Sequence, residues 1–281
     1  MRTVLITGAT SGFGKLMAHA FLNHGDRVIA TGRNLKERKD LFIQERALFG
    51  ERFLELNMDV TNLSQVKEAQ EEILKQFGHI DILINNAGYG LFGALEDLKD
   101  VEIRYQMEVN FFGTVNVTKT FLPLIMKARG KVFNFSSVFG FMGFPLTSLY
   151  CASKFAVEGL TESLRGELAP HGVQLCLIEP GGYRTNFGNS LNWSTQDDSS
   201  FKTQFQNYKN LHQKIASRKP QDPSEVSYGI LKLSLKRKLP MRKVYGKDAT
   251  FSHYFRNFTP SCIYFSVMDF VFKKIFMRES N

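Results

Sequence analysis

The chain has 281 residues, of which 43% are hydrophobic, and its formal net charge at pH 7 is +9. This length and hydrophobic content suit one large globular domain with a well-filled core. They exclude a membrane-spanning helix, because no run approaches the ~20 apolar residues that such a helix needs.

The cysteines and histidines indicate no metal site. Cys151, Cys176 and Cys262 are widely spaced and fit no metal-binding pattern, and the six histidines show no ligand spacing. We therefore predict no metal centre, and a reducing compartment. Because the first strand begins near residue 3, we expect no signal peptide and a cytoplasmic location.

Short apolar runs alternate with helical stretches along the chain. The predicted strands are 3–7, 27–31, 53–58, 80–85, 131–135 and 174–179. The predicted helices are 15–24, 35–49, 63–77, 101–128, 150–168 and 224–235. This alternation predicts an α/β fold, with a parallel sheet covered by helices on both faces.

A glycine-rich turn follows the first apolar run and precedes the first helix. In this turn Gly8 permits a sharp bend, Gly12 lets a pyrophosphate approach the backbone, and Gly14 lets the helix pack closely on the strand. The first-turn N–H groups of that helix then face the phosphates. The predicted dinucleotide contacts are Gly8, Ser11, Gly12, Phe13 and Gly14.

A second polar block, Asn85-Asn86-Ala87-Gly88, follows the apolar run at 80–84. Asparagines after such a run often only turn the chain. Here the run should end at the carboxyl edge of the sheet, where open α/β folds bind ligands. We therefore expect Asn86, Ala87 and Gly88 to contact the cofactor.

Tyr150 and Lys154 are four residues apart, and Ser137 precedes the tyrosine by thirteen residues. On a helix the phenol and the ammonium share a face. A nearby cation favours the phenolate and lowers its pKa, so the pair is a candidate proton donor and acceptor. The Ser137 hydroxyl is a candidate partner for a substrate oxygen. By itself Tyr-x-x-x-Lys is a weak signal, because both residues are common on helix surfaces.

The end of the second strand favours NADP(H) as the cofactor. Enzymes specific for NAD carry an acidic residue there to hold the ribose, whereas this chain has Gly32 followed by Arg33. A guanidinium can bind a 2′-phosphate with two charge-assisted hydrogen bonds. Lys36 and Arg38 are further candidate cations, and the alternative is that Arg33 only solvates a turn.

Together these blocks, with Asn110 and Pro180-Gly181, resemble the short-chain dehydrogenase/reductase family over about residues 2–190. The segments around Ser137 and Tyr150 resemble the hydroxysteroid and retinol dehydrogenase branch, and residues 180–187 resemble its uncharacterised bacterial members. The resemblance implies a doubly wound, seven-stranded Rossmann-type sheet, with 243–245 as its last strand. It also implies a homodimer or homotetramer.

The resemblance assigns roles to single residues. It implies a catalytic set of Asn110, Ser137, Tyr150 and Lys154, in which Asn110 bends a helix and holds a water. It also implies that Tyr150 and Lys154 contact the cofactor. The remaining implied cofactor contacts are Asp59, Val60, Pro180, Gly181 and Thr185.

Aromatic residues follow Ser137 and recur in the polar stretch 187–222, which the family uses as a substrate lid. We expect a large apolar pocket for a bulky lipophilic alcohol or ketone, sterol-like, retinoid-like or long-chain. The predicted substrate contacts are Phe139, Phe144, Leu149 and Phe187.

Two other function classes remain open at this stage. One is a non-catalytic NADPH-binding sensor with the same fold, against which the complete catalytic set argues. The other is a nucleic-acid-associated protein, because residues 201–281 contain 16 Lys and Arg against 5 Asp and Glu. No nucleic-acid-binding motif accompanies this charge, so we predict no nucleic-acid partner.

We divide the chain into an oxidoreductase domain, 1–250, and an aromatic and basic extension, 251–281. Within the extension, 261–278 has an apolar stripe at helical spacing with nearby lysines and arginines. Such a helix either packs on the lid or on a second subunit, or makes a peripheral contact with a membrane surface.

Overall fold

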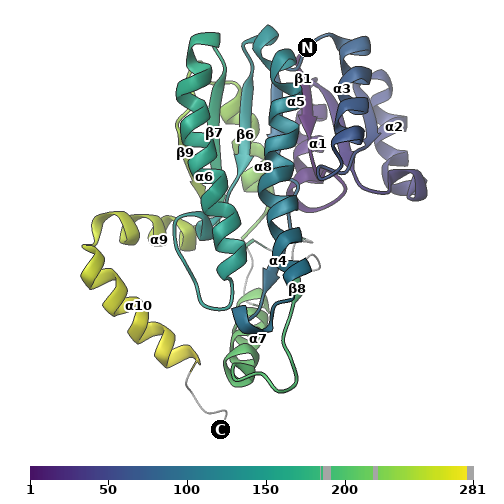
Figure 1. The fold of residues 1–281 in the computed structure, drawn as a ribbon. Coiled ribbons are helices and arrows are strands. Elements are labelled where there is room, and N and C mark those ends of the chain that lie inside the picture. Colours follow the sequence, from purple (N-terminus) through teal and green to yellow (C-terminus); the bar gives the residue numbers. More distant parts are fainter. Residues whose placement is uncertain (184, 186–190, 218–220, 277–281) are drawn as a thin grey trace.

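The computed structural model describes residues 1–183, 185, 191–217 and 221–276. Seven parallel strands form one sheet in the order β3-β2-β1-β4-β6-β7-β9 (Figure 1). The strands are β1 (Thr3–Ile6), β2 (Arg27–Gly32), β3 (Phe53–Asn57), β4 (Ile82–Asn85), β6 (Lys131–Phe135), β7 (Gln174–Pro180) and β9 (Arg242–Tyr245). The seven-stranded parallel sheet is thus confirmed, including the strand expected at 243–245.

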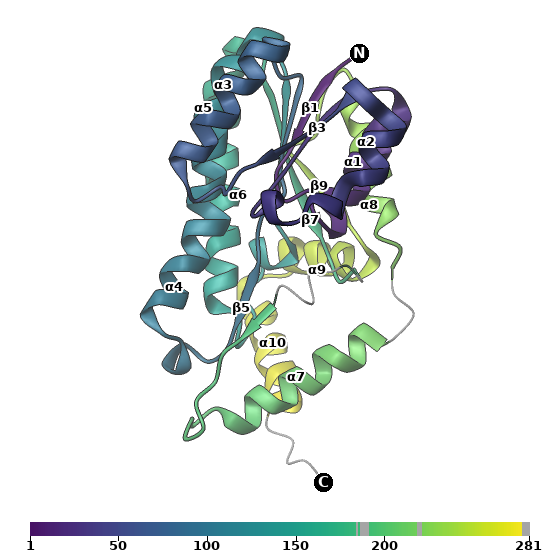
Figure 2. The same ribbon diagram turned by 90° about the vertical axis from the view of Figure 1, so that its right-hand side faces the viewer.

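Helices cover both faces of this sheet, as the edge view in Figure 2 shows. On one face lie α3 (Leu63–Phe77), α4 (Asp100–Met107), α5 (Gly113–Ala128) and α6 (Ser148–Leu168). On the other lie α1 (Gly12–His24), α2 (Ile43–Phe49) and α8 (Ser224–Ser234). The fold is therefore doubly wound.

The strands separate two apolar cores because alternate side chains point to opposite faces. In β1, Val4 and Ile6 join Phe21 of α1 in one core, while Leu5 joins Phe121 of α5 in the other. All five side chains are fully buried. Continuous apolar runs such as Val4-Leu5-Ile6 are what a strand buried on both faces requires.

Two predicted helices are interrupted. In the predicted helix 35–49, only α2 is α-helical, and two 3-10 turns, Leu35–Glu37 and Lys39–Phe42, precede it. Asn34 enters these turns in the left-handed conformation, with φ of 56°. The predicted helix 101–128 is split into α4 and α5 by a π-helical turn, Glu108–Phe112.

The region beyond the sheet contains three elements that periodicity did not predict, β5 (Gly90–Phe92), β8 (Leu191–Trp193) and α7 (Lys202–Ser217). The short strand β8 pairs in parallel with β5. Helix α7 follows and contacts the tail helix α10 (Ser261–Phe276) below the sheet (Figure 2). Helix α9 (Lys247–Phe258) connects β9 to α10. None of the helices in the described part of the chain is long and apolar enough to cross a bilayer.

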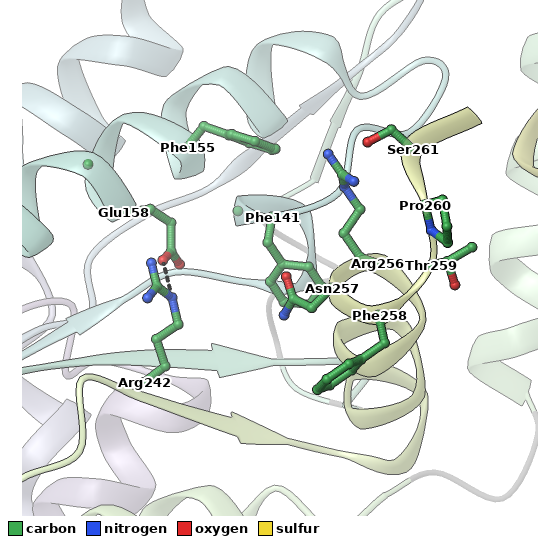
Figure 3. Close-up of a pocket in the computed structure, with 12 residues that line it drawn as sticks. Phe141, Phe155, Glu158, Arg242, Arg256, Asn257, Phe258, Thr259, Pro260 and Ser261 are labelled. Carbon is green, nitrogen blue, oxygen red and sulfur yellow. Dashed lines mark hydrogen bonds and ion pairs between the residues drawn. The ribbon is translucent and has the colours of Figure 1, made fainter. Parts of the chain in front are cut away.

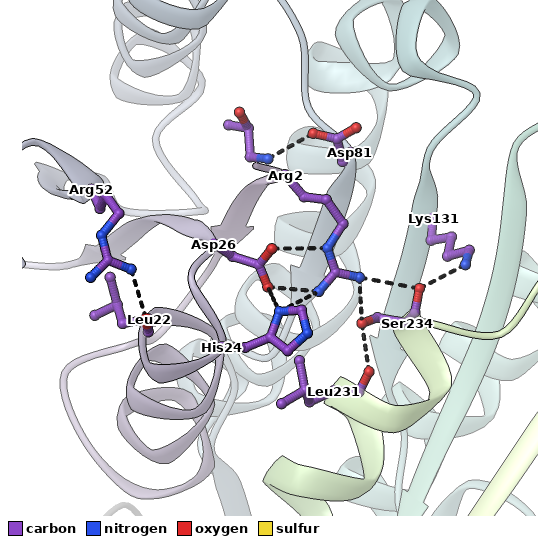
Figure 4. A network of polar contacts seen from close by, with 10 residues as sticks. Arg2, Leu22, His24, Asp26, Arg52, Asp81, Lys131, Leu231 and Ser234 are labelled. Atoms are coloured by element: carbon purple, nitrogen blue, oxygen red, sulfur yellow. Dashed lines mark hydrogen bonds and ion pairs between the residues drawn. The ribbon is translucent and has the colours of Figure 1, made fainter.

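At the amino edge of the sheet, one arginine joins three elements (Figure 4). Arg2 donates to both carboxylate oxygens of Asp26, at 2.9 and 2.6 Å, and to the hydroxyl of Ser234 at 2.9 Å. Lys131 donates to the carbonyl oxygen of Ser234 at 2.7 Å. These bonds fix the starts of β1 and β2 against the end of α8, at the edge remote from the glycine turn.

Candidate functional site

The glycine turn lines a cleft of about 630 Å³ at the carboxyl edge of the sheet. Gly8 and Gly12 have φ of 63° and 53°, which residues with side chains rarely adopt. Ser11 precedes α1 in an extended conformation, and its side chain makes no capping hydrogen bond. The first N–H groups of α1 are therefore not satisfied by their own N-cap residue, which suits an anion.

The second polar block fixes the shape of the glycine turn. The Asn86 side-chain amide donates to the carbonyl oxygens of Thr7 and Gly8, at 2.9 and 3.1 Å. The Thr7 hydroxyl accepts from the backbone N–H groups of Asn86 and Ala87, both at 3.0 Å. The ends of β1 and β4 are thus joined, and Asn86, Ala87 and Gly88 line the cleft as expected.

Ser137, Tyr150 and Lys154 meet where β6 ends beside α6. The hydroxyls of Ser137 and Tyr150 are hydrogen-bonded, and the Ser137 oxygen also accepts from the N–H of Phe139 at 3.2 Å. Lys154 donates to the carbonyl oxygen of Phe135 at 2.9 Å, and its Nζ lies 5.8 Å from the centre of the Tyr150 ring. All three side chains are buried, so the arrangement is held rigidly.

The protonation states differ from the sequence-based expectation. Burial raises the pKa of Tyr150, and the hydrogen bond to Ser137 only partly opposes this effect. Burial lowers the pKa of Lys154 to about 8, against the opposing charge of Glu158. The expected lowering of the Tyr150 pKa by Lys154 is therefore wrong for this buried phenol, whose pKa is raised. Desolvation outweighs attraction here, and Tyr150 holds its proton.

Asn110 lies in the π-helical turn between α4 and α5. Its side-chain oxygen accepts from the N–H of Tyr89, and its amide donates to the Tyr89 carbonyl and to the Ser153 hydroxyl, all at 3.0 Å. The side chain thereby connects the segment after β4 to α6, one residue before Lys154. A Cβ on Gly88 would lie 3.1 Å from the Asn110 side-chain oxygen and 3.7 Å from Lys154 Nζ. This end of the cleft therefore meets the Tyr150 site.

The far end of the cleft contains the residues expected around the adenosine. Gly32, Arg33, Arg38, Asp59 and Val60 line it. The Arg33 guanidinium is exposed and donates a hydrogen bond to the hydroxyl of Tyr105. The side chain of Lys36 lies outside the described part of the structure.

The segment after β7 is only partly at the cleft. Thr185 lines the cleft, whereas Pro180 and Gly181 do not belong to its described lining. The N–H of Gly181 donates to the carbonyl oxygen of Tyr245 at 2.9 Å, and the neighbouring N–H of Gly182 donates to Asp248 at 2.7 Å. These contacts fix the end of β7 against β9 and α9.

An aromatic cluster packs around Tyr150. Phe92 of β5 and Phe139 contact the Tyr150 ring edge-on, with centroids 5.8 and 6.0 Å away. Phe144 contacts Phe139 at 5.7 Å and Phe272 of α10 at 5.0 Å. The aromatic cluster comprises Phe92, Ala94, Phe139, Phe144, Leu146, Tyr150, Leu191, Trp193, Phe205, Tyr208, Phe272, Ile275 and Phe276. Lid and tail thus close over the tyrosine together.

Of the four predicted substrate contacts, Phe139 and Phe144 lie in the aromatic cluster. Leu149 is half-buried and not part of it, and Leu146 enters the cluster instead. Leu146 does so in the left-handed conformation, with φ of 63°, which side-chain periodicity cannot reveal. Phe187 lies outside the described residues.

Three residues of α7 lie at the site but were not among the predicted substrate contacts. Phe205 and Tyr208 are buried in the aromatic cluster, and the His212 ring lies 5.4 Å from Trp193 and 6.3 Å from Phe92. Burial lowers the pKa of His212. Their spacing of three and four residues was a helical signal within an otherwise polar stretch.

A second cavity, of about 650 Å³, lies behind α6 between β9 and the tail (Figure 3). At its base Arg242 pairs with Glu158 at 3.2 Å and with the fully buried Glu179 at 3.1 Å. Burial raises the pKa of both carboxyl groups. The neighbouring Glu158 raises the pKa of Glu179 further, and Glu162 raises that of Glu158. This cavity is separate from the cleft beside the glycine turn.

Residues 2–196 match the family described as short chain dehydrogenase. The chain belongs to the short-chain dehydrogenase/reductase family. Its glycine turn, its Asn-Asn-Ala-Gly block and its Ser137, Tyr150 and Lys154 site are therefore the expected features of an oxidoreductase of this family that uses a nicotinamide cofactor.

Three similar proteins illustrate this membership. The 3-ketodihydrosphingosine reductase of Bacteroides thetaiotaomicron is 43% identical over 192 residues, which cover 68% of this chain and 67% of that protein. A short-chain dehydrogenase from Streptomyces avermitilis has a TM-score of 0.81 and 32% identity, over 90% of this chain and 91% of its own. A tyrosine-to-phenylalanine variant of ElxO with NADPH bound has a TM-score of 0.71 and 28% identity, over 86% of this chain and 95% of its own.

Proposed function

We propose that this protein is an NADP(H)-dependent oxidoreductase that interconverts a bulky lipophilic ketone and its alcohol, with Tyr150 as the proton donor and acceptor. One observation carries the proposal: the Tyr150 phenol is hydrogen-bonded to Ser137 while its ring forms the floor of an aromatic cluster. The reacting hydroxyl and an apolar surface for the substrate thus meet at one residue.

The residues of the cleft fit a nicotinamide dinucleotide. The glycine turn and the uncapped start of α1 would hold the pyrophosphate, and Asn86, Ala87 and Gly88 would contact the adjoining ribose and adenine. Lys154, at the inner end, would hold the nicotinamide ribose. The bound nicotinamide would supply or accept the hydride.

The choice of NADP(H) rests on the end of β2. Gly32 stands where a carboxylate would repel a 2′-phosphate, and the exposed Arg33 guanidinium lines the same part of the cleft. The hydrogen bond to Tyr105 orients the guanidinium. It uses only one of the five N–H donors, so the others can bind a phosphate. Binding of NADPH by ElxO supports the same choice.

Proton transfer follows from the pKa of Tyr150. Because burial keeps the phenol protonated, Tyr150 can donate its proton to a ketone oxygen as negative charge develops there. The Ser137 hydroxyl, held by the Phe139 N–H, can donate a second hydrogen bond to that oxygen. After Tyr150 has donated its proton, the Lys154 ammonium stabilises the resulting Tyr150 phenolate.

The aromatic cluster supports a lipophilic substrate. Its members present rings and aliphatic carbons, and burial lowers the pKa of the neighbouring His212, which favours the neutral ring. A small charged substrate would find no fixed counter-charge among the described cluster residues. The 3-ketodihydrosphingosine in the name of one relative is consistent with a long-chain ketone.

The test is NADPH oxidation with a series of ketones of rising chain length, each also measured with NADH. We expect kcat/KM to rise with chain length by up to about fifteenfold for every two methylene groups, because each buried CH₂ contributes ~0.8 kcal/mol. NADPH should be preferred. Highest activity on a small charged carbonyl, or a preference for NADH, would contradict the proposal, and cofactor binding without any turnover would favour the sensor.

A further inference from the structure

Two consecutive helices of the tail expose a row of large apolar side chains. We call the outer tail face the set Phe251, Tyr254 and Phe258 of α9 with Ile263, Val267 and Phe270 of α10. Their exposed fractions run from 40% for Val267 to 80% for Phe258. Exposed side chains of this size gathered on adjoining helices are uncommon on a surface that faces only water.

The exposed apolar residues of each helix follow the helical repeat, and a lysine lies at one end of each row. Lys247 and the three α9 residues are spaced i, i+4, i+7 and i+11, and the three α10 residues and Lys274 repeat the same spacing. Both lysines are exposed. An apolar stripe with a cation on the same face is the pattern of a helix that lies in a membrane interface.

The protein itself does not cover this face, because the tail packs through its opposite side. In α10, Tyr264 and Phe276 are buried and Phe272 contacts Phe144 of the aromatic cluster. In α9, Ala249 is buried, and the Arg256 guanidinium lies 4.8 Å from the centroid of the Tyr264 ring. Arg256 lines the second cavity, and Phe258, the last residue of the exposed α9 row, lines the same cavity (Figure 3). The sequence left two expectations for the tail, packing on the protein or contact with a membrane surface. In α10 these two expectations concern different faces of the helix.

The charge of the region indicates what the outer tail face would meet. Residues 201–281 have a balance of +11, from 16 basic and 5 acidic residues, whereas residues 1–200 have −2, from 20 and 22. On α9, the exposed Asp248 accepts hydrogen bonds from the N–H of Gly182 and from the side-chain amide of Gln221. A second copy would bring an equally basic face and would be repelled, whereas an anionic lipid surface is complementary.

We propose that the outer tail face docks on an anionic lipid bilayer, with α9 and α10 lying in the interface. Because no described helix spans a bilayer, the contact is peripheral. The inner side of α10 forms a wall of the aromatic cluster, so docking would bring the hydrocarbon within about one helix diameter, ~10 Å, of that cluster. The docking goes beyond the proposed function, and its test needs no turnover.

The test is cosedimentation of the full chain with phosphatidylcholine vesicles, with and without one quarter phosphatidylglycerol. We expect binding to the anionic vesicles that weakens with salt, and at least tenfold less to the neutral ones. The double variant Phe258→Ser, Phe270→Ser should lose at least tenfold in binding. The matched control, Leu48→Ser with Val101→Ser, changes residues 72% and 69% exposed on α2 and α4 and should bind as the wild type does.

Charge and self-association are tested separately. Lys247→Glu with Lys274→Glu should abolish the preference for anionic vesicles, while Lys75→Glu with Lys232→Glu, on α3 and α8, should leave it in place. The proposal would be overturned if the wild type did not bind vesicles. It would also be overturned if each tail variant and its matched control lost vesicle binding to the same extent. Light scattering showing a wild-type oligomer that Phe258→Ser, Phe270→Ser converts to a monomer would overturn it as well, since a second copy would then be the occupant.

Discussion

Helix α1 can approach the glycine turn only because residue 14 has no side chain: the carbonyl oxygen of Gly8 occupies the place of a Gly14 Cβ. The same Cβ would lie 2.8 Å from the Asn86 amide nitrogen and 2.9 Å from the Cα of Ala9. Since the first two obstacles are backbone or hydrogen-bonded to backbone, neither can move away freely.

Gly14→Ala should therefore weaken both the fold and the cofactor site. We expect a loss of ~1–3 kcal/mol in the free energy of unfolding, typical of overpacking, and at least tenfold weaker NADPH binding. Urea unfolding and fluorescence titration measure the two effects. Gly166→Ala is the matched control, because it changes an exposed glycine of α6 with nothing within 4 Å of the new Cβ. Equal stability of the two variants would contradict the packing argument.

Arg33→Ser should change the choice of cofactor. Removing the guanidinium should raise the KM for NADPH about tenfold or more and leave that for NADH unchanged, because only NADPH carries the 2′-phosphate. Initial rates with both cofactors measure this. Arg104→Ser, which removes an exposed arginine paired with Asp100 outside the cleft, should change neither KM.

The stability of the protein should fall as the pH rises through the weakly acidic range. Burial raises the pKa of Glu179 from 4.5 to about 8, so between these values the folded chain holds a proton that the unfolded chain has released. Stability from this group is thus present below pH ~4.5 and lost towards pH 8. Glu179→Gln keeps the shape without the titration, and should flatten this fall in the free energy of unfolding.

Urea unfolding at pH 5, 6, 7 and 8 measures the effect, expected to reach a few kcal/mol across the range. Glu68→Gln, on the surface of α3, is the control and should leave the pH dependence unchanged. A Glu179→Gln profile as steep as that of the wild type would contradict the buried carboxyl pair.

Phe276→Ala should weaken binding of long substrates selectively. The Phe276 ring contacts Phe144 at 6.0 Å and Tyr208 at 5.8 Å, so its loss opens the wall that the tail contributes to the aromatic cluster. We expect KM for a long-chain ketone to rise about tenfold, and that for a short ketone to stay the same. Phe251→Ala, which truncates a side chain 70% exposed on α9, should alter neither in the absence of vesicles. Equal effects on both ketones would mean that the tail only stabilises the fold.

The sheet and the glycine turn could be predicted from the sequence because each depends on local patterns. An uninterrupted apolar run such as Val4-Leu5-Ile6 fits only a strand that is buried on both faces. The positive φ values of Gly8 and Gly12 favour glycine over any residue with a side chain. The site around Ser137, Tyr150 and Lys154 followed from spacing and from family resemblance.

What the sequence did not reveal depends on long-range packing. The pKa of Tyr150 is set by burial under the lid and tail, whereas spacing along α6 showed only its lysine neighbour. The position of Leu146 depends on one left-handed residue, and α7 is held by α10, about sixty residues further along the chain. Spacing of 205, 208 and 212 pointed to a helix there, but polar neighbours masked it.

The most direct test of the account compares Tyr150→Phe with the wild type in NADPH oxidation on a long-chain ketone, with NADPH binding measured on the same samples. Phenylalanine keeps the ring contacts with Phe92 and Phe139 and removes only the hydroxyl. We predict that kcat falls by about 10²–10⁴-fold while the Kd for NADPH stays within twofold. Turnover near the wild-type rate would show that another group supplies the proton, and would contradict the assignment of Tyr150.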